Sequence, residues 1–112
     1  MRLIAQRTVL VLASLVALNG AGWAQEPAVR ITIQNHRFQP AEVRIRAGAP
    51  ATLLVRNADA TAEEFESKQL RVEKVIPGNS EAVIQLRALQ PGRYKFYGEY
   101  NEATAQGVLV VE

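Results

Sequence analysis

Residues 91–111 read PGRYKFYGEYNEATAQGVLVV, which combines a turn, an alternating segment, a loop and a final apolar segment. Pro91-Gly92 is a turn signal. After it, apolar and polar side chains alternate, so that Tyr94 and Phe96 share one face, as in a strand that is buried on one side. A loop follows, and then the apolar run Val108–Val111. The stretch therefore predicts two strands joined by a loop.

The same kind of pattern occurs upstream. Alternating or apolar runs separated by turn residues occupy residues 28–35, 42–47, 53–57 and 82–87. Short strands at this spacing are typical of an all-β sandwich, and they leave no room for a long helix. The sequence therefore predicts an all-β fold of about seven strands. Residues 58–64 are compatible with one helical turn or with a loop. Tyr94, close after a turn, is expected to bind backbone through its hydroxyl, as the tyrosine corner does in other sandwiches.

The N-terminal part has the features of a signal peptide. A positively charged start, with Arg2 and Arg7, is followed by an uncharged apolar run and by small residues around the predicted cleavage point after Ala24. The apolar run is too short to span a bilayer as a stable helix. We therefore expect residues 1–24 to be removed on export to the periplasm, and residues 25–112 to form one domain.

The composition of the expected domain excludes several classes of protein. Without the leader it has as many basic as acidic residues, 11 of each, which argues against a nucleic-acid or anionic-membrane binder. The chain has no Cys, so thiol catalysis, Cys-ligated zinc and iron–sulfur clusters are excluded. Its one His has no nucleophile-elbow motif near it. No catalytic residue is predicted, and an enzyme is the less favoured interpretation.

A series of landmarks runs through nearly the whole expected domain. They are Asn35…Phe38-Gln39-Pro40, Val43-x-Ile45-x-Ala47-Gly48, Val55-x-Asn57-x-Asp59, Glu64-Phe65-Glu66, Pro77-Gly78, Pro91-Gly92-x-Tyr94-x-Phe96 and Gly107-x-Leu109-Val110-Val111. In this order the chain resembles the cupredoxin-like family, specifically the EfeO/FtrB-type domains associated with bacterial iron uptake. The resemblance implies a Greek-key β-sandwich whose ligands, if any, cluster at one end.

The ligands of a blue-copper site are missing from the positions that the resemblance assigns to them. Such a site needs two His, one Cys and a weak axial ligand such as Met. The resemblance places the first His near Glu64, the Cys at about Gly98, the second His at about Asn101 and the Met at about Ala105. All four ligands are replaced, so type 1 copper is not expected.

Oxygen-bearing side chains stand there instead. Glu64 and Glu66 are two residues apart, so on a strand their carboxylates point to the same side while Phe65 points into the core. By the resemblance, this segment meets the loop before the last strand. A cation relieves the repulsion between converging carboxylates, and oxygen ligands suit hard ions. The candidate metal ligands are Glu64, Glu66, Glu99, Glu102, Asn101 and His36, with Glu73 as a weaker candidate.

These residues also allow plainer interpretations. Glu64 and Glu66 could form the charged outer face of an edge strand, which discourages aggregation, and His36 could be a turn residue hydrogen-bonded locally. The leading hypothesis is a periplasmic metal-binding protein that handles iron, or copper, for an inner-membrane iron permease or a companion periplasmic iron-binding protein. One alternative is a metal-free interaction module. Another is an oxidase subunit whose metal site is completed by a partner.

Overall fold

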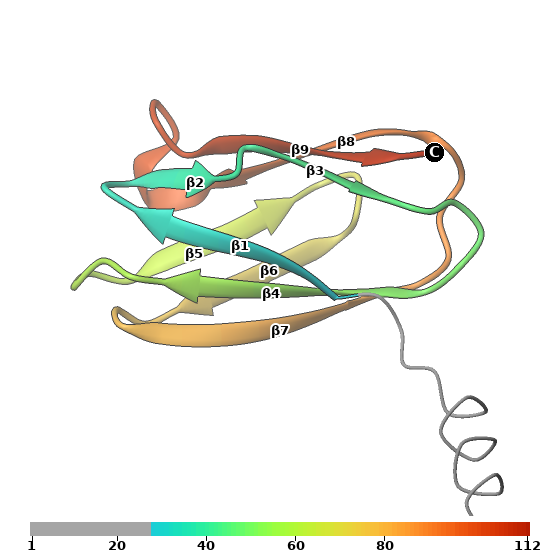
Figure 1. The fold of residues 1–112 in the computed structure, drawn as a ribbon. Coiled ribbons are helices and arrows are strands. Elements are labelled where there is room, and N and C mark those ends of the chain that lie inside the picture. Colours follow the sequence, from blue (N-terminus) through green and yellow to red (C-terminus); the bar gives the residue numbers. More distant parts are fainter. Residues whose placement is uncertain (1–27) are drawn as a thin grey trace, which may run out of the picture.

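A computed structural model describes residues 28–112, and the predicted signal peptide over residues 1–24 lies outside the described residues. The described part is a sandwich of two sheets (Figure 1). Its elements are β1 (Ala28–Gln34), β2 (Arg37–Gln39), β3 (Glu42–Ile45), β4 (Ala51–Asn57), β5 (Glu63–Ser67), β6 (Val72–Ile76), β7 (Ser80–Leu86), β8 (Gly92–Gly98), the 3-10 helix η1 (Glu99–Asn101) and β9 (Gln106–Val111). Within this part, no helix has the length and apolar character needed to cross a membrane.

The two sheets have the strand orders β2-β1-β4-β7 and β3-β9-β8-β5-β6. The chain passes repeatedly from one sheet to the other, and the pairs β1/β4 and β3/β9 are parallel while the others are antiparallel. The predicted all-β sandwich is confirmed, although residues 28–112 form nine strands and not about seven. β2 was missed because it has only three residues, and β6 because Ile76 is its only fully buried side chain.

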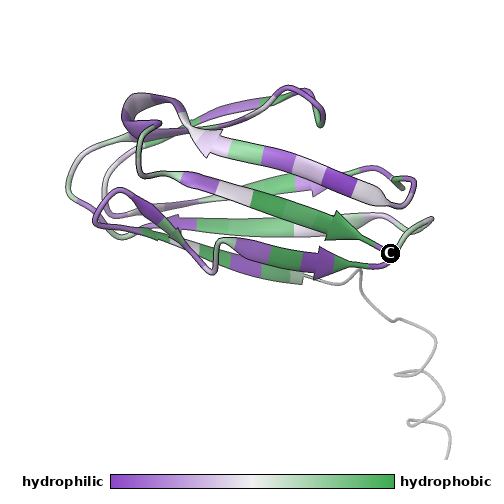
Figure 2. Ribbon diagram, turned by 90° about the horizontal axis from the view of Figure 1, so that it is seen from above, coloured by the Kyte–Doolittle hydropathy of each residue, from purple (hydrophilic) through white to green (hydrophobic). Residues whose placement is uncertain are grey.

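Alternation of apolar and polar residues builds the core between the sheets. On β7, Ala82, Ile84 and Leu86 are buried and the residues between them are exposed. Figure 2 shows the same change of hydropathy along the strands, with the apolar end of β9 at the C-terminus. Phe65 and Phe96 stack with ring centroids 4.9 Å apart, and aromatic pairs of this kind add to the energy of burial.

A buried amide joins several segments at the end of the sandwich where β4 finishes. The side chain of Asn57 is fully buried. Its Nδ2 donates to the carbonyls of Thr61 (2.9 Å), Ile76 (3.0 Å) and Pro77 (3.3 Å), and its Oδ1 accepts from the N–H of Asp59 (3.0 Å). Of the two forms that the sequence allowed for the segment after β4, the structure has the loop, and Asn57 holds that loop against the end of β6.

The predicted role of Tyr94 is confirmed. Its hydroxyl donates to the carbonyl of Gln90 (2.8 Å), four residues upstream, and its ring packs on the core. This tether fixes the entry into β8, the strand that leads to the loop with the remaining candidate ligands.

Candidate metal site

The strand β5 points two carboxylates away from the core. Glu63, Phe65 and Ser67 are buried, whereas Glu64 and Glu66 are partly exposed on the outer face of the five-stranded sheet. The predicted opposite orientation of Phe65 and its two neighbours is therefore confirmed. β5 lies between β6 and β8, so the interpretation of an edge strand is wrong. The two carboxylates project from a strand that has a neighbour on each side, so an adjacent strand can bring a third acidic group to them.

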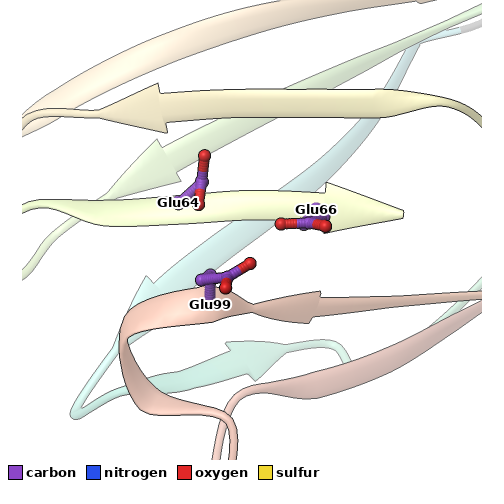
Figure 3. A group of neighbouring side chains, drawn as sticks. All are labelled: Glu64, Glu66 and Glu99. Atoms are coloured by element: carbon purple, nitrogen blue, oxygen red, sulfur yellow. The ribbon is translucent and has the colours of Figure 1, made fainter. Parts of the chain in front are cut away.

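That third group is Glu99, the first residue after β8. Because Gly98 pairs with Phe65, the chain leaves β8 beside β5. One carboxylate oxygen from each of Glu64, Glu66 and Glu99 lies within 4.8 Å of the others (Figure 3). Oxygen atoms that bind one ion at about 2.0–2.6 Å are separated by no more than roughly 5 Å, so the three groups are close enough to share a cation.

The contact between Glu66 and Glu99 shows the electrostatic cost of this cluster. The pKa of the Glu99 carboxyl is raised to about 7, because it donates a hydrogen bond to Glu66, loses part of its hydration and faces the negative charges of Glu66, Glu64 and Glu102. Accepting that hydrogen bond lowers the pKa of Glu66. Glu66 Oε1 is shielded from water and has no hydrogen-bond partner among residues 28–112. A proton, a cation or an ordered water beside this oxygen would supply the missing partner.

Tyr97 and Glu73 flank the cluster on the neighbouring strands. The Tyr97 hydroxyl donates to Glu66 Oε2 (3.0 Å), and its pKa is raised to about 12 by burial, by this hydrogen bond and by nearby carboxylates. Glu73 is the cross-strand partner of Glu66 on β6. Burial raises the pKa of Glu64, and the charges of Glu73 and Glu66 raise it further. Acidic groups therefore surround the position that a cation would occupy.

His36 is placed in a turn and outside the group of three carboxylates. Asn35 and His36 both have positive φ, 55° and 58°, and form the two-residue connection between β1 and β2. The Asp59 carboxylate accepts from their backbone N–H groups (2.8 and 3.0 Å) and lies 3.5 Å from His36 Nδ1. These hydrogen bonds, that of His36 first, lower the pKa of Asp59. His36 is therefore a turn residue, but its partner Asp59 comes from a distant segment of the chain and not from the turn itself.

The other two predicted ligands follow Glu99 in the same loop. Asn101 turns its amide inward and donates from Nδ2 to Glu63 Oε2 (2.8 Å). Glu102 is exposed, and its backbone carbonyl accepts from the side chain of Gln106. Its charge contributes to the raised pKa of Glu99, but neither residue belongs to the group of three converging oxygens.

Glu63 lies beside the candidate site and was not among the residues predicted from the sequence. It is 1% exposed, and its carboxylate accepts from the N–H of Glu64, the N–H of Tyr100 and the amide of Asn101. The alternation along β5 contained the signal, because a residue two positions before the inward-facing Phe65 must share its face. A carboxylate on an inward face needs partners, and here the loop after β8 supplies them.

Of the positions that the resemblance assigned to blue copper, Gly98, Asn101 and Ala105 lie together, but Glu64 faces outward and Glu63 takes the inward place beside them. A Cβ on Gly98 would lie 2.6 Å from Glu63 Cδ and 2.7 Å from Ala105 Cβ, so Glu63 and Ala105 fill the space of a Cys side chain. Asn101 is bound to the same Glu63. No sulfur or imidazole ligand is present among these four residues, so the donor set of type 1 copper is missing.

The raised pKa of Glu99 predicts a pH-dependent stability in the metal-free protein. An unfolded Glu99 ionises near 4.5, whereas the folded one ionises near 7. The stabilisation from the protonated form is therefore lost as the pH rises from about 4.5 through 7. Glu99→Gln keeps a donor toward Glu66 at every pH, so its melting temperature should fall less between pH 5 and pH 8 than that of the wild type. Thermal melts with chelator present measure this.

The control is Glu102→Gln, which removes a neighbouring charge but no hydrogen bond to Glu66. It should retain most of the wild-type pH dependence. An equal pH dependence in Glu99→Gln and the wild type would show that Glu66 and Glu99 do not share a proton.

Comparisons with known proteins agree with this fold. Residues 7–111 match the family described as the cupredoxin-like domain. An uncharacterized protein of Rickettsia prowazekii (strain Madrid E) is 40% identical over 83 residues, which are 74% of this chain and 66% of the relative. The chain thus spans slightly less than two thirds of that protein's length.

Two solved structures are similar in fold. The metal-binding domain of the Streptococcus pneumoniae Cu(I)-exporting P-type ATPase CopA, with Cu(I), has a TM-score of 0.68 and 21% identity over 76% of this chain and 84% of that chain. Auracyanin A, a blue copper protein of Chloroflexus aurantiacus, has a TM-score of 0.67 and 15% identity over 79% of this chain and all of that chain (100%). At sequence identities this low, the similarity concerns the fold alone. The structural neighbours of this chain include copper-binding domains. With the match over residues 7–111, the chain belongs to the cupredoxin-like domain family.

Proposed function

We propose that this chain is a periplasmic cupredoxin-like protein that binds a hard metal ion, iron above all, as cargo for an inner-membrane iron-uptake system. Glu64, Glu66 and Glu99 are the proposed ligands. The observation that carries the proposal is Glu66 Oε1, a buried oxygen without a hydrogen-bond partner among residues 28–112, in a side chain that contacts the Glu99 carboxyl. A cation between the two groups replaces the shared proton and neutralises the cluster.

The chemistry of the site supports a hard ion over Cu(I). Soft thiolate and thioether ligands favour Cu(I), whereas carboxylate oxygens favour harder ions. The sequence contains no Cys and Met1 as its single Met, and the three converging donors are all carboxylates. Three negative charges match a trivalent ion such as Fe(III), which is the basis for preferring iron.

The exposure of the site supports transfer rather than permanent retention. Glu64 and Glu66 are partly exposed and Glu99 is exposed, on the outer face of the sheet. Three protein ligands leave coordination positions open for water or for groups of a partner. An ion held in this way can be passed to a permease or to a companion iron-binding protein, the partners expected from the resemblance.

A thermal-melt titration with Fe(III), Mn(II), Cu(II) and Zn(II) tests the proposal. A ligand that binds only the folded state stabilises it by about 2.7 kcal/mol at a hundredfold excess over its dissociation constant. For a domain of this size, that corresponds to a rise in melting temperature of roughly 10 °C or more. We expect this rise with Fe(III) or Mn(II). No rise with any of the four ions would favour a metal-free interaction module.

A further inference from the structure

The inner side of β5 carries a carboxylate that the proposed metal site does not use. Glu63 Oε1 accepts from the backbone N–H groups of Glu64 and Tyr100, both at 2.9 Å, and Oε2 accepts from Asn101 Nδ2 at 2.8 Å. The side chain is 1% exposed. A buried ionised carboxylate is costly unless donors surround it, and three donors are present.

These donors come from two separate segments of the chain. Glu64 belongs to β5, whereas Tyr100 and Asn101 belong to η1, more than 35 residues later (separations of 37 and 38 residues from Glu63). The loop is closed on itself by the Gly98 N–H, which donates to the Ala105 carbonyl (2.8 Å). Glu63 is thus the side chain whose hydrogen bonds attach this closed loop to β5.

The absence of a side chain at the end of β8 makes room for this contact. A Cβ on Gly98 would meet Glu63 Cδ at 2.6 Å and Oε2 at 2.7 Å. The carboxylate therefore lies over Gly98, between β5, the end of β8 and the loop. Three of the four positions that the resemblance assigns to copper ligands, Gly98, Asn101 and Ala105, lie around this carboxylate, and a metal held there would join the same segments.

We propose that the Glu63 carboxylate takes over the structural role of the metal ion and is a positioning residue for the outer site, because it fixes η1 on β5 and so holds Glu99 beside Glu64 and Glu66. The role toward the outer site rests on the proposed function, whereas the attachment of the loop does not. In η1, Glu99 faces the outer carboxylates while Tyr100 N and Asn101 bind inward, so the inner hydrogen bonds determine where the outer ligand stands.

Swapping the carboxylate of Glu63 and the amide of Asn101 between the two positions tests this inference. In Asn101→Asp, a second carboxylate faces Glu63 at 2.8 Å, so at pH 8 the loop should separate from β5. The amide proton of Tyr100 should then exchange with solvent at least about tenfold faster, because it loses its acceptor. Adding Glu63→Gln to this variant restores a donor and an acceptor with their roles reversed, and should return the exchange rate to within about twofold of wild type.

Amides of β1 and β4 are the internal control, since a general loss of stability accelerates them as well. If Asn101→Asp does not fold, Asn101→Ala removes the same contact without adding a charge, and its Tyr100 amide should also exchange faster. Mn(II) affinity, measured on the same variants, should fall with Asn101→Asp and recover with the double variant.

The outcomes separate this inference from the proposed function. Unchanged Tyr100 exchange in Asn101→Asp and Asn101→Ala, or no recovery in the double variant, overturns the positioning role. The single variant can show faster Tyr100 exchange and the double variant its recovery even if the wild-type protein binds no metal. That result would support the attachment of the loop by Glu63 and contradict only the proposed metal function.

Discussion

The double variant Glu64→Gln/Glu66→Gln is expected to bind Fe(III) or Mn(II) at least about a hundredfold more weakly than the wild type. Removing a residue that only orients a metal ligand typically lowers metal affinity 10–100-fold. Here two of the three proposed ligands themselves lose their charge, so the loss should be at least as large. Glutamine has nearly the same size and keeps one carbonyl oxygen, so the fold should be retained. Isothermal titration with each metal measures the change.

A charge-matched control separates ligation from general electrostatic attraction. Glu42→Gln/Glu81→Gln removes two carboxylates from exposed positions on β3 and β7, outside the cluster. This control should bind within about threefold of the wild type, because exposed charges at a distance are screened by salt. Equal affinity in the cluster variant and the wild type would place the metal elsewhere or make its binding nonspecific.

Replacing Asn57 by alanine is expected to lower the free energy of unfolding by about 3 kcal/mol. The substitution removes the donor to the carbonyls of Thr61, Ile76 and Pro77 and leaves the Asp59 N–H without its acceptor. Each buried polar group left without a partner costs about 1–3 kcal/mol. The melting temperature should fall by roughly 12–24 °C. Urea unfolding of the metal-free protein gives the free-energy difference directly.

The matching control is Gln85→Ala, an exposed polar residue on β7. Surface substitutions of this type usually stay within about 0.5 kcal/mol of the wild type. If Asn57→Ala lowers the free energy of unfolding by less than about 1 kcal/mol, water or a rearranged loop replaces the Asn57 amide. Asn57 would then not be the residue that holds the loop after β4 against the end of β6.

Most of the fold follows from the period-two pattern of the strands. Ala82, Ile84 and Leu86 alternate with polar residues and are buried, and a one-residue shift in register would have exposed all three. β2 and β6 could not be recognised in the same way. β2 is too short for a pattern, and in β6 the three residues before Ile76 are all exposed. Pairing with a neighbouring strand, which no local pattern reports, is what makes them strands.

The candidate site was predictable where local geometry determines it. The common direction of Glu64 and Glu66 follows from their spacing alone. The approach of Glu99 depends on pairing between β5 and β8, which the sequence indicates only through the resemblance. The roles of Glu63 and Asn57 depend on donors and acceptors from segments 19 or more residues away, including Ile76 and Tyr100. Such long-range partners cannot be identified from a single sequence.

The arrangement separates two roles that one copper ion would combine in a type 1 site. At the inner position, a carboxylate attaches the loop after β8 to β5 through hydrogen bonds. On the outer face, a second set of carboxylates converges, and one buried oxygen there has no hydrogen-bond partner among residues 28–112. The family's fold is retained, and the proposed metal position lies on the surface of one sheet.

The most direct test of the account is to locate bound Mn(II) by paramagnetic broadening in two-dimensional NMR spectra of the ¹⁵N-labelled protein. Carboxylate oxygens suit Mn(II), and the ion broadens the signals of nearby amides at low occupancy. We predict that residues 64–66 and 97–102 lose intensity first, and that Glu64→Gln/Glu66→Gln abolishes the effect. Broadening centred on His36 and Asp59, or no localised broadening at all, would contradict the proposed site.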